Sequence, residues 1–316
     1  MNYIVLDLEW NQCPGGKRRE EAQLPFEIIE IGAVRLDEDL RETGTFREII
    51  RPQVYTRLHF RTRQIVHLTE ADFEGRRAFP EVFRDFLAWC GEDPAFCIWG
   101  SSDLTELQRN IAWHGMEQPF PFPFFYYDVQ KLFSIVYEDR KTRRSLEWAA
   151  QFLSLPEEQE FHDAYSDASY TARILQTIDP EVIRANSSID CYRTPRSRKE
   201  EIRVTYPGYV KTISRPFADR YEAIRDREVS STRCTFCGKP ARKKIRWFSS
   251  GRNYHCLAWC EEHGWIKGKA RMRLDREGRT YVVKTIRPAT DQEALAIREK
   301  QEILRVKRRI RRQAGN

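Results

Sequence analysis

A buried strand that ends in two carboxylates constrains this chain more than any other feature. Residues 3–7, Tyr-Ile-Val-Leu-Asp, form a β-branched and aromatic run that is typical of a buried strand. Asp7 and Glu9 close it, and because alternate residues of a strand share a face, both carboxylates point to one side. Burying two like charges together is unfavourable unless a cation compensates them. The N-terminus therefore predicts a cation site at the end of a buried strand.

Two further segments offer groups of the same chemistry. Asp103 begins a predicted helix directly after a short apolar run at 96–100. The alternative explanation for this residue is that a negative charge in the first turn of a helix interacts favourably with the helix dipole. His162 and Asp167 are five residues apart, about 500° of helical rotation, so they can flank one site. Carboxylates favour Mg²⁺ or Mn²⁺, and a pair of such ions can clamp the attacking and leaving oxygens of a phosphodiester. A histidine titrates near neutrality and can take a proton from water.

The order of expected elements indicates an α/β fold. Strands are predicted at 3–7, 26–36 and 45–52, and helical stretches at 145–153 and 163–178. Strands that come first and then alternate with helices are typical of a mixed sheet flanked by helices.

At these residues the sequence resembles the DEDDh exonucleases, the DnaQ-like family of 3′–5′ exonucleases with a ribonuclease-H-like fold. Its motifs match Asp7-Leu8-Glu9-Trp10-Asn11, Trp99-Gly100-Ser101-Ser102-Asp103-Leu104 and His162-Asp163-Ala164-Tyr165-Ser166-Asp167. The flanks 27–33 and 145–149 are also similar. The tyrosine variant of the family needs Tyr four positions before the last Asp, where this chain has Asp163, so the histidine subclass is indicated. The resemblance covers about residues 1–178.

The resemblance implies a two-metal hydrolase that uses Mg²⁺ or Mn²⁺. Asp7 would bridge both ions, Glu9 and Asp167 would hold the ion that activates water, and Asp103 would support the other. His162 would deprotonate the water, and a nucleoside 5′-monophosphate would leave. Catalysis is thus expected from His162 with the four carboxylates.

The residues around the motifs are most similar to the RNA-trimming branch of the family that is related to histone-mRNA exonuclease. This similarity favours RNA over DNA as the substrate. The expected partners are the 3′ ends of single-stranded RNA or DNA. Trp10 is a candidate for contact with the terminal nucleotide, with a core role as the alternative. The competing function is a regulatory or adaptor protein that uses the same fold to bind a partner.

A cluster of cysteines near the C-terminus indicates a structural zinc site. Cys234 and Cys237 form a Cys-x2-Cys knuckle followed by glycine. After 22 intervening residues, Cys260 and His263 repeat that spacing. His255 or Cys256 remain alternative ligands. We expect one Zn²⁺ in a zinc-ribbon-like extension, since a closed four-ligand site serves stability rather than catalysis.

Charge divides the chain into two parts. Residues 1–185 carry 21 Lys and Arg against 32 Asp and Glu, a net charge of −11, and residues 186–316 carry 33 against 15, a net charge of +18. Basic residues beside aromatic ones suit contact with phosphates and bases, whereas a solvated basic face is the alternative. The candidate nucleic-acid contacts in the basic part are Arg242, Lys243, Lys244, Lys267 and Lys269.

These patterns predict the domain organisation. We expect an exonuclease domain at 1–185, a linker or extended connection at 186–230, a basic zinc-binding module at 231–290 and a basic helix at 291–316. No apolar run approaches the roughly 20 residues needed to cross a bilayer. The first residues lack the basic and apolar regions of a signal peptide, so we expect a cytoplasmic protein without a membrane partner.

Overall fold

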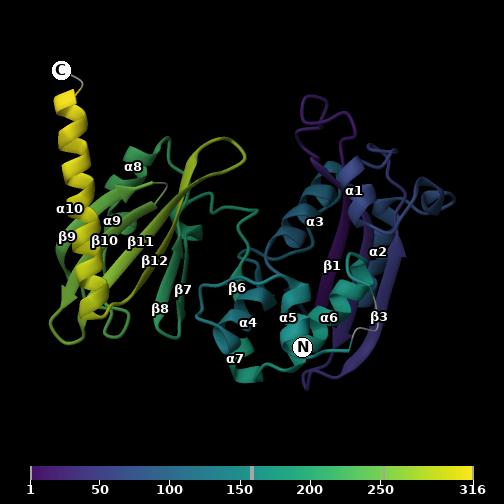
Figure 1. The fold of residues 1–316 in the computed structure, drawn as a ribbon, viewed down its shortest axis with the longest axis horizontal. Coiled ribbons are helices and arrows are strands. Elements are labelled where there is room, and N and C mark those ends of the chain that lie inside the picture. The colour runs from purple at the N-terminus through teal and green to yellow at the C-terminus, as the bar shows by residue number, and fades with distance from the viewer. Residues whose placement is uncertain (1, 157–159, 252, 315–316) are drawn as a thin grey trace. The chain divides into compact units, whose positions relative to one another are not determined.

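The chain forms two compact units, Met1–Tyr192 and Arg193–Asn316. The structure is a computed structural model that describes residues 2–156, 160–251 and 253–314. Each unit contains its own six-stranded sheet (Figure 1).

Unit 1 is built on a mixed sheet with the strand order β3-β2-β1-β4-β5-β6. Its strands are β1 (Asn2–Gln12), β2 (Phe26–Leu36), β3 (Glu42–Ile49), β4 (Pro94–Ile98), β5 (Phe125–Asp128) and β6 (Ser188–Ile189). β1 pairs antiparallel with β2 and parallel with β4. This mixed α/β sheet confirms the predicted fold class.

Helices cover both faces of this sheet. They are α1 (Phe60–Ile65), α2 (Phe79–Cys90), α3 (Ser102–Trp113), α4 (Val129–Tyr137), α5 (Leu146–Phe152), α6 (Ala164–Gln176) and α7 (Pro180–Ala185), with a 3₁₀ turn η1 (Glu70–Phe73). The strand β1 alternates between the two layers. Ile4 and Leu6 pack in the cluster that contains residues of α2 and α3, whereas Tyr3 and Val5 pack in the cluster that contains residues of α4, α5 and α6. By this alternation the odd-numbered Asp7 belongs to the α6 side.

A glycine lets α6 approach the sheet closely. Gly32 lies opposite Asp7 on β2. A Cβ atom there would lie 2.1 Å from the backbone carbon of Ala164, the first residue of α6. The missing side chain therefore allows the N-terminus of α6 to lie against the end of β1.

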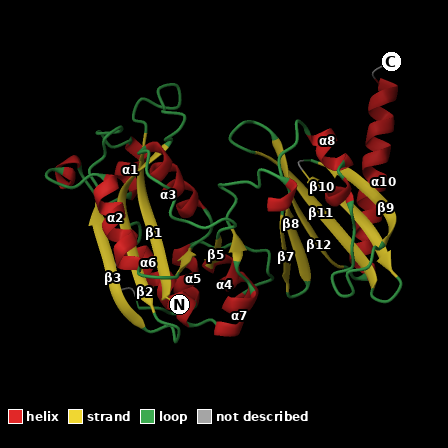
Figure 2. Ribbon diagram, turned by 180° about the vertical axis from the view of Figure 1, so that it is seen from behind, coloured by secondary structure: helices red, strands yellow, loops and turns green. Residues whose placement is uncertain are grey.

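Unit 2 is an antiparallel sheet with the strand order β7-β8-β12-β11-β10-β9. Its strands are β7 (Ile202–Tyr206), β8 (Tyr209–Ile213), β9 (Arg242–Ser250), β10 (Asn253–Cys260), β11 (Gly264–Leu274) and β12 (Thr280–Pro288). The remaining elements are η2 (Arg198–Glu200), α8 (Arg220–Arg225), α9 (Arg227–Ser230) and α10 (Asp291–Ala314). Figure 2 shows α10 beside this sheet, where it contacts β9, β10 and β11.

The stretch 186–230, predicted to be a linker or extended connection, contains short strands and helices. β7 and β8 form a hairpin through Pro207 and Gly208, and β8 pairs with β12 at one edge of the second sheet. Lys284 of β12 also donates hydrogen bonds to the carbonyl groups of Glu228 and Ser231. These short strands combine β-branched residues with Arg and Lys, so their pattern alone did not identify them.

α10 packs on the sheet through one stripe of apolar residues. Ala294, Ile297 and Leu304 lie in a cluster with Phe248 and Leu257 of the sheet. Across the parts of the chain that the structure describes, no helix combines the length and the apolar character that a bilayer crossing requires.

Candidate functional sites

The end of β1 places two carboxylates beside the adjacent strand. Asp7 lies opposite Gly32, and Glu9 lies opposite Glu30 of β2. The pairing is interrupted between Glu9 and Trp10 by a register shift, a feature that is common beside active sites. Asp7 and Glu9 are half-buried, whereas Glu30 is fully buried.

Asp103 joins this group from the first turn of α3, which begins shortly after β4. This residue is 5% exposed. Burial raises the pKa of Asp103 to about 7, while hydrogen bonds from its own backbone and that of Leu8 act in the opposite direction. The hydrogen bond from the Leu8 backbone connects Asp103 to β1. The carboxylate of Asp103 therefore does more than interact favourably with the dipole of α3.

The N-terminus of α6 supplies the other two residues. Asp163 caps the helix by accepting a hydrogen bond from the Ser166 amide. His162, just before the cap, is exposed and has a φ of +68°, a conformation that costs about 1–3 kcal/mol in a residue other than glycine. Its amide donates to the Asp167 carboxylate over 3.4 Å. Backbone strain of this kind is concentrated at functional sites.

The fold brings the predicted residues into one cluster. Potential ligand atoms of Glu9, His162 and Asp167 all lie within 4.8 Å of one another. Asp7 and Asp103 lie outside that tight group but are close enough to interact electrostatically with Asp167. All five residues predicted for catalysis thus lie in one region of unit 1.

The carboxylates of this cluster destabilise one another's charged forms. Burial, followed by the charge of Asp167, raises the pKa of Glu9 to about 8. Burial and then the charge of Asp103 raise the pKa of Asp7 well above its usual range. The pKa of Asp167 is raised to about 6, mainly by burial. A divalent cation would remove this penalty, and oxygen ligands of this kind fit Mg²⁺ or Mn²⁺.

A second group of charged residues beside the cluster was not predicted. Arg47 of β3 pairs with Glu30, with Nε and Oε1 3.2 Å apart, and also with Asp163. It therefore connects β2 to the cap of α6, next to His162. Glu30, a charged residue between Ile29 and Ile31 in the middle of a predicted strand, was the available signal. Its partners depend on strand register and were not evident from the sequence.

Trp10 and Asn11, the two residues after Glu9, contact other parts of unit 1. Trp10 packs against the main core, with its ring 5.7 Å from that of Phe26, which agrees with the core alternative. Asn11 is fully buried and donates to the carbonyl groups of Tyr55 and Arg57. Asn11 therefore anchors the loop that follows β3.

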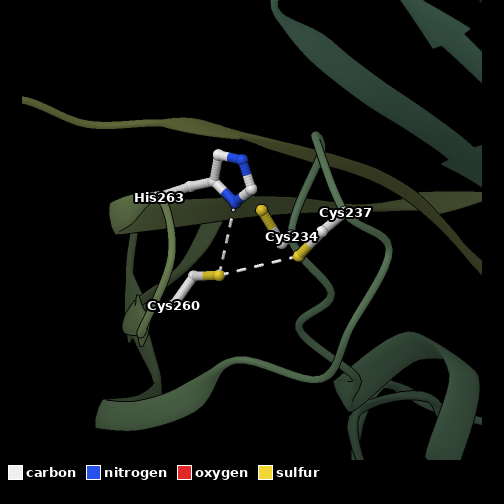
Figure 3. Close-up of side chains that lie close together, drawn as sticks. All are labelled: Cys234, Cys237, Cys260 and His263. Carbon is white, nitrogen blue, oxygen red and sulfur yellow. Dashed lines mark hydrogen bonds between the residues drawn. The ribbon is translucent and has the colours of Figure 1, made fainter.

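The four predicted zinc ligands converge in unit 2. Ligand atoms of Cys234, Cys237, Cys260 and His263 all lie within 4.8 Å of one another (Figure 3). The sulfur of Cys260 is 3.7 Å from that of Cys237 and 3.7 Å from Nδ1 of His263. A tetrahedron around zinc with bonds of about 2.3 Å to sulfur has edges of about 3.8 Å. The hydrogen bond to His263 is the main cause that lowers the pKa of Cys260 to about 6, which favours the thiolate that metals bind.

The alternative ligands lie apart from this group. Cys256 is fully buried in β10, and burial raises its thiol pKa to about 12. Its sulfur would be 2.6 Å from a Cβ placed on Gly268, so it occupies a packed position in the sheet. His255 lies beside Lys300 of α10, with Nε2 and Nζ 3.4 Å apart. The geometry thus favours Cys260 and His263 over either alternative.

The candidate basic residues occupy two places in unit 2. Arg242, Lys243 and Lys244 are exposed on β9. Lys267 and Lys269 lie on β11, where Lys267 pairs with Glu293 and Lys269 is exposed. Trp10, the remaining candidate, belongs to unit 1.

Comparisons with known proteins agree with this site. The family model described as RNase_T, exonuclease, matches residues 4–175. No curated protein matches the chain. Among solved structures, the nuclease domain of 3′hExo, a DEDDh family member bound to rAMP, is 19% identical with a TM-score of 0.50, over 60% of this chain and 96% of that one.

Two further similar structures have TM-scores below 0.5. Cell-death related nuclease 4 is 18% identical with a TM-score of 0.48, over 60% of this chain and 65% of that one. E. coli exonuclease I in complex with a dA16 oligonucleotide is 14% identical with a TM-score of 0.44, over 67% of this chain and 54% of that one. The family match spans more than half of the chain and contains the whole carboxylate cluster. The chain belongs to the exonuclease family that this model describes.

Proposed function

We propose that this protein is a metal-dependent 3′–5′ exonuclease that removes nucleoside 5′-monophosphates from single-stranded nucleic acid. The observation that carries the proposal is the convergence of Glu9, His162 and Asp167 within 4.8 Å, with Asp7 and Asp103 beside them. Raised carboxylate pKa values are expected where a cation is the missing partner.

The four carboxylates are the proposed holders of two Mg²⁺ or Mn²⁺ ions. Such ions, when bound, activate water and stabilise the charge that develops on the scissile phosphate. Asp7 is central, since the charges of Glu9, Asp103 and Asp167 all raise its pKa. Asp103 is fixed by α3 and by the Leu8 backbone, so its oxygens are held in place before any ion binds.

His162 is the proposed general base. It is exposed, so it can reach a water molecule, and it lies at the edge of the carboxylate group. The backbone amide of His162 donates a hydrogen bond to Asp167, and the next residue, Asp163, caps α6. These two interactions set the position of His162 relative to α6. Arg47 holds that cap to β2 through Glu30 and keeps the histidine next to Glu9.

We propose RNA as the preferred substrate. The similar structure with a TM-score of 0.50 is a nuclease domain bound to rAMP, and the motif context resembles the RNA-trimming branch. The same cluster can hydrolyse DNA, because its residues act on the phosphodiester and not on the 2′-hydroxyl.

The zinc ligands support a separate, structural role in unit 2. The 3.7 Å separations match the edges of a zinc tetrahedron, and four protein ligands leave no open position for a substrate. We propose that one Zn²⁺ connects the 234–238 turn to the β10–β11 hairpin.

The test is degradation of 5′-labelled single-stranded RNA and DNA of equal sequence with Mn²⁺. Shortening from the 3′ end, faster on RNA and stopped by excess chelator, is the expected result. Glu9→Gln should remove it, whereas Glu92→Gln, an exposed glutamate outside the cluster, should not. If wild-type protein with Mn²⁺ leaves both strands intact, the adaptor alternative replaces this function.

A further inference from the structure

One face of the second sheet carries a cluster of cations beside α10. In the β10–β11 pairing, His255 lies opposite Lys269 and Asn253 lies opposite Arg271. Alternation places these residues on the same face as Leu257, which packs in the α10 cluster. The side chains of Lys269 and Arg271 are exposed.

α10 contributes a further cation to this face. Nζ of Lys300 lies 3.4 Å from Nε2 of His255. Burial, and then the charges of Lys300 and Lys269, lower the pKa of His255 to about 4. The histidine is therefore neutral at pH 7, and its ring nitrogen can accept a hydrogen bond from Lys300. Burial, Arg271 and Lys300 in turn lower the pKa of Lys269.

No carboxylate balances these charges among the described residues. Lys267, two residues along β11, pairs with Glu293, and the same carboxylate also binds Arg287. Lys269, Arg271 and Lys300 form no such ion pair in the described parts of the chain. Like charges held together without a counter-charge destabilise the protein unless an anion binds them. The contrast with Lys267 indicates a surface with a binding role.

The charge continues along the helix. Lys307 and Arg311 follow Lys300 by seven and eleven residues, which places all three on one flank of α10 at 3.6 residues per turn. All three side chains are exposed. The cations thus form an extended row, which suits a chain of phosphates better than a single small anion.

We propose that Lys269, Arg271 and Lys300 bind the phosphate backbone of a single-stranded nucleic acid, with Lys307 and Arg311 extending the binding surface. This inference rests on the proposed function for the identity of the polymer. It assigns strand binding in unit 2 to the sheet face on which α10 packs.

The experiment measures binding of fluorescein-labelled rU20 and dT20 to zinc-loaded protein without Mg²⁺ or Mn²⁺, by anisotropy over a range of salt concentrations. The double variant Lys269→Gln, Lys300→Gln should bind about tenfold more weakly. The slope of log affinity against log salt should flatten by about 1.4, which is about 0.7 for each phosphate that the variant no longer neutralises. Inorganic phosphate at millimolar concentration should compete poorly.

Two control pairs make the result decisive. Lys141→Gln, Lys199→Gln changes the charge equally at exposed lysines outside the cluster and should stay within about twofold of wild type. Lys269→Arg, Lys300→Arg keeps the charge and should bind like wild type, which excludes loss of fold. The proposal would be overturned if both glutamine double variants bound the strands equally weakly, or if Lys269→Gln, Lys300→Gln bound them as tightly as wild type.

A separate readout distinguishes this inference from the proposed function. Hydrolysis of a small chromogenic phosphodiester with Mn²⁺ reports on unit 1 alone. Its rate should be unchanged in the double variant Lys269→Gln, Lys300→Gln. Failure of wild-type hydrolysis would reject the proposed function, while the binding comparison would still decide the role of the cluster.

Discussion

The two candidate metal sites use opposite electrostatics. In unit 1, carboxylates from β1, α3 and α6 raise one another's pKa and leave an exposed histidine at the edge. In unit 2, a hydrogen bond from His263 lowers the pKa of Cys260, and four ligands surround one point. The first arrangement is unfavourable until a cation binds, and it keeps room for substrate. The second favours the thiolate at Cys260, whereas the pKa of Cys237 is raised, because a backbone hydrogen bond from Lys239, which lowers it, is outweighed by burial and by hydrogen bonds to Cys234 and Cys260. Its four ligands form a closed site, which suits stability.

The largest expected effect is on hydrolysis by unit 1. Asp7→Asn and Asp167→Asn should each abolish exonuclease activity, because each removes a negative charge that the ions require. Melting temperature of the metal-free protein should stay level or rise, since repulsion is relieved. A strong loss of stability in these variants would instead assign the carboxylates a structural role.

The next effect separates the base from the metal ligands. His162→Ala should lower the hydrolysis rate by about 10²–10⁴, the usual range for a positioned general base. Binding of Mn²⁺, followed by calorimetry, should survive in this variant. Wild-type turnover at neutral pH would refute the assignment of the base.

For unit 2 the expected effect is on stability. Zinc should copurify at one atom per chain, and Cys237→Ser should lose it. Residues of the 234–264 region should then exchange amide hydrogens faster, because small zinc modules fold with their metal. Cys191→Ser, a cysteine outside the cluster, is the matched control. Elemental analysis that finds no zinc in protein prepared without chelators would contradict this role.

A smaller effect is a pH response of opposite sign in the two units. Glu9 and Asp103 have raised pKa values in the folded state, so the stability they contribute to metal-free unit 1 is lost as pH rises from about 5 to about 8. In the zinc-free protein Cys260 has a lowered pKa, so the stability that it contributes to unit 2 is lost as pH falls from about 9 towards about 6. Hydrogen exchange resolved by unit should show both trends. A common trend in both units would refute the comparison.

The sequence predicted both sites because each depends on local pattern. Asp7 and Glu9 follow a short apolar strand, and the cysteine knuckles have fixed spacing, so a metal site could be predicted at each without knowledge of the fold. Arg47 and Glu30 were missed because their partners depend on the register between β1, β2 and β3. The approach of α6 at Gly32 likewise depends on packing between distant segments.

The strands within 186–230 were not predicted, for a different reason. β7 and β8 are only five residues long each, and both include charged residues. β8 pairs with β12, more than 60 residues away along the chain, and β7 pairs in turn with β8. An edge hairpin of this kind is determined by its neighbour and not by its own periodicity.

The most direct measurement of the central claim is a titration with Mn²⁺. Zinc-loaded protein, freed of Mg²⁺ and Mn²⁺ by dialysis, should bind two Mn²⁺ ions per chain by electron paramagnetic resonance. Asp7→Asn should lose this binding and Glu92→Gln should keep it, while both retain one zinc atom. Absence of Mn²⁺ binding in the wild type, or unchanged binding in Asp7→Asn, would contradict the assignment of the carboxylate cluster as the catalytic metal site.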